Sequence, residues 1–458
     1  MAIATVNPTT GATEREFTPH SSEEVDRRIG LAQHAFESLK ATSFAHRAQW
    51  LRAAADLLDA EAPATARMIV TEMGKPLAQA EAEIHKSAKG LRYYAEHAEG
   101  FLAEEPLDDP STVGASRAWT RYEPLGVVLA VMPWNFPVWQ ALRFAAPALA
   151  AGNTGLLKHA SNVPQTALYL DGLFHRAGFP EGAFQALLVG SDAIEAVIDD
   201  PRVKAVTLTG SEPAGRAVAA AAGARVKKSV LELGGSDPFI VLPSADLDAA
   251  VDTAATARTI NNGQSCIAAK RFIVHTDVYD EFARRFTDAL AALTVGDPLD
   301  PATDVGPLAT ESGRDDLAEL VDDAVAKGAK VLTGGTAPDR PGWFYEPTVL
   351  ADLPDDAAIV QDEAFGPVAA LYRAADNADA ARIANQTAFG LSSAVWTADP
   401  DEQDWFIRRL DAGAVFVNGM TVSFPELPFG GVKHSGYGRE LAAAGIREFT
   451  NLKTVWRA

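Results

Sequence analysis

The sequence contains a single cysteine, Cys266, among its 458 residues. No intramolecular disulfide is therefore possible, and a reducing compartment is expected. Basic residues are also scarce, because 40 Lys and Arg stand against 61 Asp and Glu, which gives a net charge of −21. Such a charge repels phosphate backbones and anionic lipid headgroups, so we expect neither nucleic acid nor a membrane surface as a partner.

Apolar runs long enough to cross a membrane are missing as well. The most apolar stretch, Leu125–Gly152, is interrupted by Asn135, Arg143 and three prolines, which makes it a poor membrane span. The N-terminal residues do not show the basic and then apolar order of a secretory signal. We therefore expect a soluble, cytoplasmic protein.

The histidines give no metal-binding pattern. The closest two of the nine lie 12 residues apart, so no pair falls on one helix face at the spacing of zinc sites. We expect no bound metal. Hydrophobic residues nevertheless make up 47% of the chain, which is typical of a globular protein with sizeable cores.

The first 105 residues are expected to be mainly helical. Ser21 and Glu24 have the spacing of a capping box, and apolar residues between Val25 and Leu39 then recur at helical intervals. Two further helical patterns and a turn-rich, acidic boundary segment follow, at residues 45–73, 77–102 and 104–116.

Beyond this boundary, short apolar strands alternate with helical stretches in two blocks. This is the pattern of βαβ crossovers, which form parallel sheets. The fold class is therefore α/β, with two parallel-sheet units. The expected strands are Thr154–Leu157, Ala186–Val189 and Ala205–Leu208 in the first block, and Phe272–His275, Lys330–Leu332, Val368–Tyr372 and Ala414–Val417 in the second. Separate β pieces are expected at Ala118–Tyr122, Gly126–Val131 and Asn451–Arg457.

Cys266 is the first candidate for chemistry. Cysteine is a strong nucleophile when a neighbour lowers its pKa or a positive charge lies near it. Here it follows small and polar residues, in the order NNGQSC from Asn261. A free cysteine can equally be a small buried residue, so this residue alone leaves both interpretations open.

Two glycine-containing segments add weaker indications. Residues 206–215 (VTLTGSEPAG) predict a strand and then a turn at Gly210 and Ser211 that opens a helix, whose N-terminus suits a pyrophosphate. Glu232 lies between apolar residues just before two glycines. A carboxylate there would be partly desolvated, with a raised pKa, and could take a proton from water. Each could instead be structural, as an ordinary turn or an ion-paired glutamate.

Five separated motifs together resemble the aldehyde dehydrogenase superfamily in their order and spacing. They are Pro133–Pro137 (PWNFP), Leu231–Gly235 (LELGG), Gly263–Cys266 (GQSC), Glu363–Pro367 (EAFGP) and Pro428–Gly431 (PFGG). The resemblance covers essentially the whole chain. Within the superfamily the chain looks most like the bacterial succinate-semialdehyde dehydrogenases, through residues 91–97 (LRYYAEH), 158–160 (KHA) and 433–440 (KHSGYGRE).

The resemblance implies a Rossmann-like cofactor domain, an α/β catalytic domain and a small β arm for oligomerisation. The dinucleotide-binding domain would comprise residues 1–105 and 125–234, the catalytic domain residues 235–430, and the arm residues 106–124 and 431–458. Relatives assemble through such an arm, and an exposed strand edge tends to pair with another chain. A homodimer or homotetramer is therefore expected.

The resemblance also implies roles for three catalytic residues. Cys266 would attack the aldehyde carbon, and the Asn135 amide with the Cys266 backbone N–H would hold the oxyanion. Glu232 would activate the water that hydrolyses the thioester. Relatives that acylate coenzyme A lack this glutamate, so hydrolysis to the acid is expected. Two other classes, a non-catalytic protein on this scaffold and a cysteine hydrolase without a dinucleotide, fit poorly because the catalytic and cofactor residues are all present.

The cofactor residues follow from the same resemblance. NAD-preferring members carry a glutamate three residues after the lysine that contacts the adenosine ribose, where this chain has Ser161. A glutamate would repel a 2′-phosphate, whereas a serine can donate a hydrogen bond to it. We therefore expect NADP to be preferred and NAD to be accepted. The implied contacts are Lys158 at the adenosine ribose, Gly210 and Ser211 at the pyrophosphate, Glu363 at the nicotinamide ribose, and Trp134, Leu233 and Phe365 along the site.

Arg143 is the candidate for substrate recognition. If a helix begins near Pro137, then Asn135, Trp139 and Arg143 form one stripe, with Arg143 roughly 12 Å along the axis from Asn135. A guanidinium there suits a short aldehyde with a distal carboxylate, such as succinic semialdehyde or, alternatively, glutarate semialdehyde. An ordinary ion-paired arginine is the other interpretation. Ser423 matches a second substrate position of the relatives.

Overall fold

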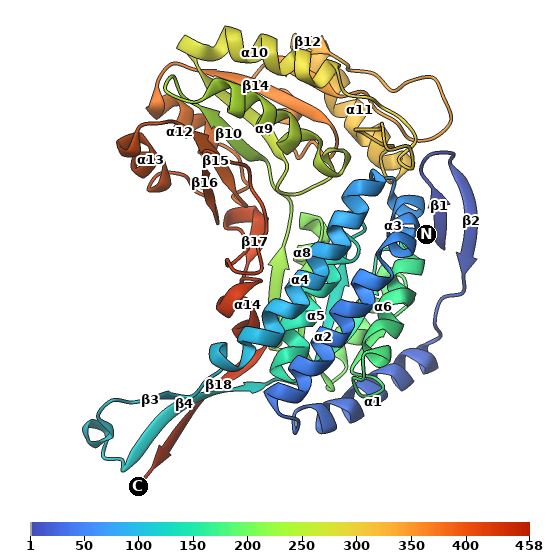
Figure 1. The fold of residues 1–458 in the computed structure, drawn as a ribbon, viewed down its shortest axis with the longest axis vertical. Coiled ribbons are helices and arrows are strands. Elements are labelled where there is room, and N and C mark those ends of the chain that lie inside the picture. Colours follow the sequence, from blue (N-terminus) through green and yellow to red (C-terminus); the bar gives the residue numbers. More distant parts are fainter. Residues whose placement is uncertain (1) are drawn as a thin grey trace.

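The computed structural model describes residues 2–458, and Figure 1 shows an upper lobe, a lower body and a thin arm that projects from the lower body. The described residues form a six-stranded, a seven-stranded, a three-stranded and a two-stranded sheet. The two large sheets are almost entirely parallel, which confirms the α/β fold class.

The lower body is built on the six-stranded sheet, in the order β17-β9-β8-β5-β6-β7. All neighbours are parallel except β17 and β9. The expected strand at 186–189 lies earlier in the structure, at 184–186. The strands are β5 (Val127–Met132), β6 (Thr154–His159), β7 (Phe184–Ala186), β8 (Val203–Thr209), β9 (Lys228–Glu232) and β17 (Gly436–Tyr437).

Helices cover both faces of this sheet because β5 is apolar on both sides. Val128 and Ala130 pack against one helical layer, and Val127 and Leu129 pack against the other. The first layer contains α2 (Phe44–Ala60), α3 (Ala62–Met73), α4 (Leu77–Phe101), α5 (Trp139–Ala151) and α6 (Pro164–Arg176), and the second contains α1 (Ser22–Leu39), α7 (Ile194–Asp199) and α8 (Glu212–Ala224). Every residue of α5 is buried, so its side chains are fixed in place by packing.

The N-terminus forms a β-hairpin, β1 (Ile3–Asn7) and β2 (Ala12–Phe17), which the helical expectation for residues 1–105 missed. The turn between the strands is closed by hydrogen bonds from Thr10 and Gly11 to the Asn7 carbonyl, and Gly11 has a left-handed φ of 74°. The second strand, ATEREF, is exposed along nearly its whole length. It therefore lacks the apolar alternation by which strands are predicted.

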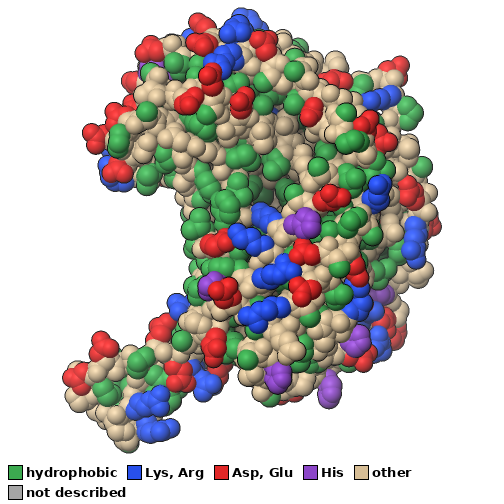
Figure 2. Space-filling view, viewed as in Figure 1, with side chains coloured by type: hydrophobic (Ala, Val, Ile, Leu, Met, Phe, Trp, Pro, Cys, Tyr) green, Lys and Arg blue, Asp and Glu red, His purple; other side chains and the backbone are tan. Residues whose placement is uncertain are grey.

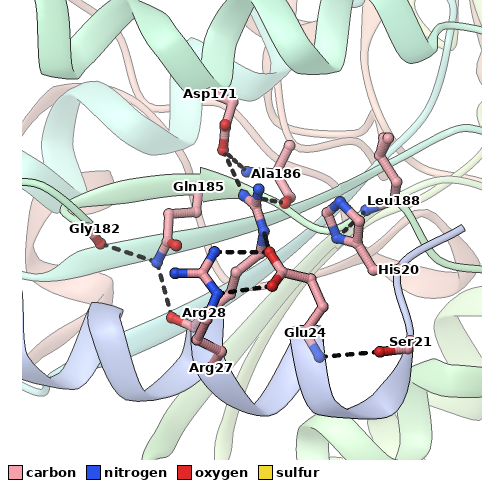
Figure 3. A network of polar contacts seen from close by, with 10 residues as sticks. All are labelled: His20, Ser21, Glu24, Arg27, Arg28, Asp171, Gly182, Gln185, Ala186 and Leu188. Atoms are coloured by element: carbon pink, nitrogen blue, oxygen red, sulfur yellow. Dashed lines mark hydrogen bonds and ion pairs between the residues drawn. The ribbon is translucent and has the colours of Figure 1, made fainter. Parts of the chain in front are cut away.

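The helix expected after Ser21 is confirmed as α1. The Glu24 backbone N–H donates to the Ser21 Oγ at 3.3 Å, but the Glu24 carboxylate pairs with Arg27 and Arg28 instead of completing a capping box (Figure 3). Arg28 also donates to Asp171 on α6 and to the Ala186 carbonyl on β7, both at 3.0 Å. These contacts hold α1 against the edge of the sheet.

The upper lobe is built on the seven-stranded sheet, in the order β12-β13-β14-β11-β10-β15-β16, in which only β12 is antiparallel to its neighbour. The strands expected in this block are confirmed. They are β10 (Asp237–Val241), β11 (Ala269–His275), β12 (Lys330–Thr333), β13 (Thr348–Ala351), β14 (Val368–Ala374), β15 (Ser393–Trp396) and β16 (Val415–Val417). The helices of this lobe are α9 (Leu247–Thr259), α10 (Thr276–Ala291), α11 (Glu311–Ala326), α12 (Asn377–Asn385) and α13 (Pro400–Ile407).

The arm is the three-stranded sheet of β3 (Glu105–Pro106), β4 (Arg117–Pro124) and β18 (Thr450–Arg457). The two strands expected here, at 118–122 and 451–457, pair antiparallel over eight residues. The preceding elements, β17 and α14 (Ala442–Glu448), pack against the lower body, on β9 and on α4 and α5.

None of the helices within residues 2–458 is both long and apolar enough to cross a membrane. The same residues contain no group of three or more His, Cys, Asp and Glu side chains placed to hold a metal ion. Acidic and basic side chains are intermixed over the face shown in Figure 2, and hydrophobic side chains gather in its recess between the lobe and the arm.

Candidate active site

A cavity of about 300 Å³ opens between the lower body and the upper lobe. The lower body contributes the segments that follow the carboxyl ends of β5, β8 and β9, which is where parallel α/β sheets bind ligands. The upper lobe contributes the segments around Cys266 and Glu363. The predicted residues that line this cavity are Trp134, Asn135, Gly210, Ser211, Leu233, Cys266, Glu363 and Phe365.

Cys266 follows a loop with a left-handed backbone at three consecutive residues. The φ angles are 58° at Asn261, 59° at Asn262 and 74° at Gly263. Asparagine and glycine adopt this conformation at the least cost, which explains the NNG sequence. The buried Asn262 side chain also fixes the loop, because its Nδ2 donates to the carbonyls of Gly74 and Pro307, each at 2.9 Å.

Asn135 lies against the same loop. Its Nδ2 donates to the Gln264 carbonyl at 3.0 Å, and the Asn261 Nδ2 donates to the Asn135 carbonyl at 2.8 Å. The Asn135 amide carries a second N–H, for which no acceptor is found among the described residues. The side chain is buried, so its position next to Cys266 is set by packing and by these two hydrogen bonds.

Lys270, which the sequence analysis did not identify, connects Cys266 to Glu363. Its Nζ donates to the carbonyls of Ser265 at 2.7 Å and Cys266 at 2.8 Å, and it pairs with Glu363 at 3.0 Å. Burial raises the pKa of the Cys266 thiol to about 12, although the positive charges of Lys270 and Arg143 act in the opposite direction. Desolvation therefore disfavours the Cys266 thiolate, and an additional positive charge nearby would favour it.

Glu232 is buried at the end of β9, and neither of its carboxylate oxygens accepts a hydrogen bond from the described residues. Burial raises the pKa of Glu232 well above its ordinary value, and the nearby Glu440 adds to this effect. Space beside the carboxylate depends on Gly430, because a Cβ there would lie 2.6 Å from the Glu232 Oε1. Glu232 is thus a desolvated carboxyl group that is free to accept a proton.

A second cavity, of about 570 Å³, lies along α7 and α8. Lys158 lines it, and burial lowers the pKa of this lysine. Asp192 and Glu195 also line it, so one ammonium faces two carboxylates. Ser161 lies close by in the chain but does not line the cavity itself; its hydroxyl makes no hydrogen bond with the described residues.

The two cavities fit the two halves of a dinucleotide. Both touch the N-terminal part of α8, where the first backbone N–H groups have no partner within the helix and suit a pyrophosphate. The Ser211 side chain makes no capping bond to this helix, so its hydroxyl is free. In the cavity next to Cys266, the rings of Trp134 and Phe365 meet edge to face, with their centres 5.8 Å apart.

A narrower cavity, of about 70 Å³, extends from the other side of Cys266 and is lined by Arg143 and Ser423. Arg143 is ion-paired through its Nε with Glu440, and its guanidinium lies 4.6 Å from the centre of the Phe429 ring. The helix α5 begins at Trp139, close to the predicted start near Pro137, so Trp139 and Arg143 of the predicted stripe lie on it and Asn135 precedes it. Arg143 therefore lines a cavity beside Cys266, as a substrate-binding residue would. It is also ion-paired, which was the alternative interpretation of this arginine in the sequence.

Three polar residues of this region were missed by the sequence analysis: Lys86, Lys270 and Glu440. Glu440 ends the segment KHSGYGRE, and Lys270 stands four residues after Cys266. Their positions next to these motifs could have been used to predict that they lie near the site. Lys86 offers no such signal, because its neighbour in the cavity, Ser423, is 337 residues away in the chain.

Comparison with known proteins gives full-length matches. The chain matches the aldehyde dehydrogenase family over residues 1–455. It is 64% identical to a succinate-semialdehyde dehydrogenase [NADP(+)] of Mycobacterium avium, over 100% of this chain and 97% of that protein. It is 63% identical to succinate-semialdehyde dehydrogenase [NADP(+)] 1 of Mycobacterium tuberculosis, with both chains fully covered. The solved succinic semialdehyde dehydrogenase of Streptococcus pyogenes in complex with NADP+ superposes with a TM-score of 0.96, at 34% identity and 99% coverage of both chains.

Proposed function

Because this chain belongs to the aldehyde dehydrogenase family, we propose that it oxidises succinic semialdehyde to succinate, with NADP+ preferred and NAD+ accepted. One observation carries the proposal: the Cys266 thiol lies at the junction of the cavity assigned to the nicotinamide half of the dinucleotide and a narrow cavity lined by basic and hydroxyl groups. A hydride acceptor and a carboxylated aldehyde can therefore reach the same sulfur from two sides. The names of the similar proteins, which specify this aldehyde and NADP, support the choice of substrate.

In the proposed reaction, the Cys266 thiolate attacks the aldehyde carbon. The second N–H of Asn135 and the backbone N–H of Cys266 stabilise the resulting oxyanion. Bound NADP+ would supply the hydride acceptor for this carbon, and its positive charge would favour the Cys266 thiolate, whose formation is opposed by the burial that raises the thiol pKa. The carbon then forms a thioester with Cys266.

Hydrolysis completes the reaction. Glu232 takes a proton from water, the hydroxide adds to the thioester carbon, and the Cys266 thiolate leaves as the carboxylic acid forms. The burial of Glu232 and the absence of hydrogen bonds to its oxygens within residues 2–458 support this role, because a raised pKa makes the carboxylate a better base.

The remaining residues are assigned to binding. Lys158 and Ser161 would hold the adenosine ribose and its 2′-phosphate, Gly210 and Ser211 the pyrophosphate, and Glu363 the nicotinamide ribose. Trp134, Leu233 and Phe365 would form the walls of the site. Arg143 and Ser423 would face the carboxylate of the aldehyde in the narrow cavity.

The proposal extends to the assembly and location of the protein. A second copy would pair through the arm to give a homodimer or homotetramer, supported by the large apolar side chains exposed there, Leu452 and Trp456. The single cysteine and the acidic composition favour the cytoplasm. We retain the proposed domain division, with the dinucleotide-binding domain at 1–105 and 125–234 and the catalytic domain at 235–430.

The test is the absorbance of reduced nicotinamide, measured with purified protein, succinic semialdehyde, and NADP+ or NAD+ in parallel. Glutarate semialdehyde and butanal serve as comparison substrates, and Cys266→Ala as the inactive control. We expect the greatest kcat/KM with succinic semialdehyde and NADP+. Turnover of butanal alone would overturn the substrate but keep the reaction, and no turnover of any aldehyde would overturn the proposed function.

A further inference from the structure

Lys86 lies in the narrow cavity beside Cys266 and has no role in the reaction proposed above. It comes from the middle of α4, and its Nζ donates to the Ser423 Oγ at 2.8 Å. The same nitrogen lies 4.6 Å from the centre of the Trp139 ring, within the range of a cation–π contact. These two contacts hold the ammonium group at the wall of the cavity.

Among residues 2–458, no carboxylate lies within ion-pair distance of Lys86. The neighbouring lysines of the same segment are both neutralised: Lys75 pairs with Glu83 at 2.5 Å, and Lys89 pairs with Glu426 at 2.8 Å. Lys86 therefore differs from them in carrying a half-buried positive charge without an anion. A partly desolvated charge without an anionic partner is unfavourable, so an anion that enters this cavity would be stabilised beside Lys86.

The charged groups around Lys86 also favour an anion in this cavity. Burial, together with the positive charge of Arg143, lowers the pKa of Lys86 to about 8. The carboxylate that acts against this shift is Glu83, which already accepts hydrogen bonds from the backbone N–H groups of Val138 and Trp139, at 2.8 and 2.9 Å. The lining of the cavity is thus positive and has no carboxylate of its own.

Ser423 supplies a second donor in the same place. Its buried Oγ accepts hydrogen bonds from the Lys86 Nζ and from the Trp139 Nε1, the latter at 3.0 Å. With both acceptor positions used, the hydroxyl hydrogen is available to donate, and no described residue accepts it. Two N–H groups of the ammonium and one O–H group are therefore available to a single anion.

We propose that Lys86, together with Ser423, binds the distal carboxylate of the aldehyde and that Lys86 is the residue that selects carboxylated substrates. The inference rests on the proposed function, because it takes the aldehyde carbon to be at Cys266 in the same cavity. Arg143 contributes positive charge to the same cavity, but its Nε is paired with Glu440, so Lys86 is the lining cation for which residues 2–458 give no carboxylate partner. The small volume of the cavity favours a short, unbranched chain between the two ends.

The experiment compares two aldehydes of equal chain length, succinic semialdehyde and butanal, with NADP+ present. Lys86→Met removes the charge and keeps an unbranched side chain that is one atom shorter. We expect the ratio of their kcat/KM values to fall by at least about tenfold through a higher KM for succinic semialdehyde, while kcat/KM for butanal changes by less than about twofold. Lys86→Arg should recover part of the ratio. Lys89→Met, on the exposed face of the same helix, should leave it unchanged.

An unchanged ratio in Lys86→Met, with a lowered ratio in Arg143→Ala, would assign the anchor to Arg143 and overturn the inference while leaving the proposed function intact. A wild-type protein that does not prefer succinic semialdehyde would instead overturn the proposed substrate. If Lys86→Met does not fold, inhibition of butanal oxidation by succinate is compared between the wild type and Lys86→Gln. An inhibition constant raised by about tenfold or more supports the inference, and an unchanged one contradicts it.

Discussion

At the scale of single residues, we expect the choice of cofactor to depend on Ser161. In Ser161→Glu, we expect a new carboxylate to repel the 2′-phosphate of NADP+ and to bind the free hydroxyl of NAD+ instead. The ratio of kcat/KM for NADP+ over NAD+ should fall by at least about tenfold, which corresponds to ~1.4 kcal/mol. Steady-state rates with each cofactor measure this ratio. Ser161→Ala is the matched control, because it removes the hydroxyl without adding charge. A Ser161→Glu variant that still prefers NADP+ would contradict the assignment of Ser161 to the 2′-phosphate.

We expect Glu232 to act in the second half of the proposed reaction only. In Glu232→Gln, hydride transfer needs no base and should continue, whereas hydrolysis of the thioester should slow by on the order of 10²–10⁴-fold. Rapid mixing should therefore show a burst of about one reduced nicotinamide per Cys266, followed by a slow steady state. In the wild type, the pKa of Glu232 is raised by burial, so the carboxylate is lost as the pH falls through that raised value, and hydrolysis should fall with it. A variant with full steady-state turnover would exclude Glu232 as the base.

At the scale of elements, the loop before Cys266 depends on its asparagines. Asn262→Ala removes three buried hydrogen bonds, two donated to backbone carbonyls and one accepted from the Gly306 N–H, and leaves a β-carbon at a φ of 59°. Asn262→Gly removes the same hydrogen bonds but suits this conformation. We expect the alanine variant to lose about 2–4 kcal/mol of unfolding free energy. The glycine variant should be more stable than alanine by about 1–2 kcal/mol.

Denaturant unfolding measures both values, and the single-turnover rate reports whether Cys266 has moved. Equal stability of the two variants would mean that the left-handed backbone is not strained at this position. If both variants lose single-turnover rate and Asn262→Gly is more stable than Asn262→Ala without being faster, the side-chain hydrogen bonds of Asn262 position the nucleophile.

Sequence patterns predicted those elements whose burial is visible locally. The strands of both parallel sheets are apolar over several consecutive residues, and β10 is buried at all five of its positions. Their apolar sequences were therefore sufficient to predict them as buried strands. The hairpin of β1 and β2 was missed because β2 is exposed, and its sequence does not alternate apolar and polar residues. The start of α5 was predicted to within about two residues, because Pro137 suits the first turn of a helix and the backbone is already helical at Val138.

At the scale of the whole molecule, the candidate site consists of motifs that can be identified in the sequence and of contacts between distant residues that cannot. Cys266, Asn135 and Glu232 belong to motifs with a fixed local order, so the roles proposed for them follow from the resemblance. The environment of each was not, because it depends on chain segments far apart. Lys86 meets Ser423 across 337 residues, and Arg143 meets Glu440 from another element altogether. Charge pairing of this kind decides whether an arginine is free to bind a ligand, and a single sequence does not contain it.

The arm is the part of the molecule with no core of its own. Its outer strand, β18, is paired on one side with β4, and the described chain leaves its other edge open. Leu452 and Trp456 are about half exposed, at 55% and 52%. They lie four residues apart and therefore on the same face of the strand. An open edge beside an apolar face is favourable only where a second chain covers both.

We therefore expect the wild-type protein to sediment as a dimer or tetramer, and Leu452→Glu with Trp456→Glu to shift it toward the monomer. The two carboxylates would be buried without partners in the assembled state, which is strongly unfavourable. Lys453→Gln is the control, since this residue points to the opposite face and pairs with Glu123; it should sediment like the wild type. Unfolding of the double variant is followed separately, so that a loss of assembly is distinguished from a loss of fold. A wild-type chain that sediments as a monomer would contradict the assembly, and an oligomer that survives the double variant would assign the interface to another surface.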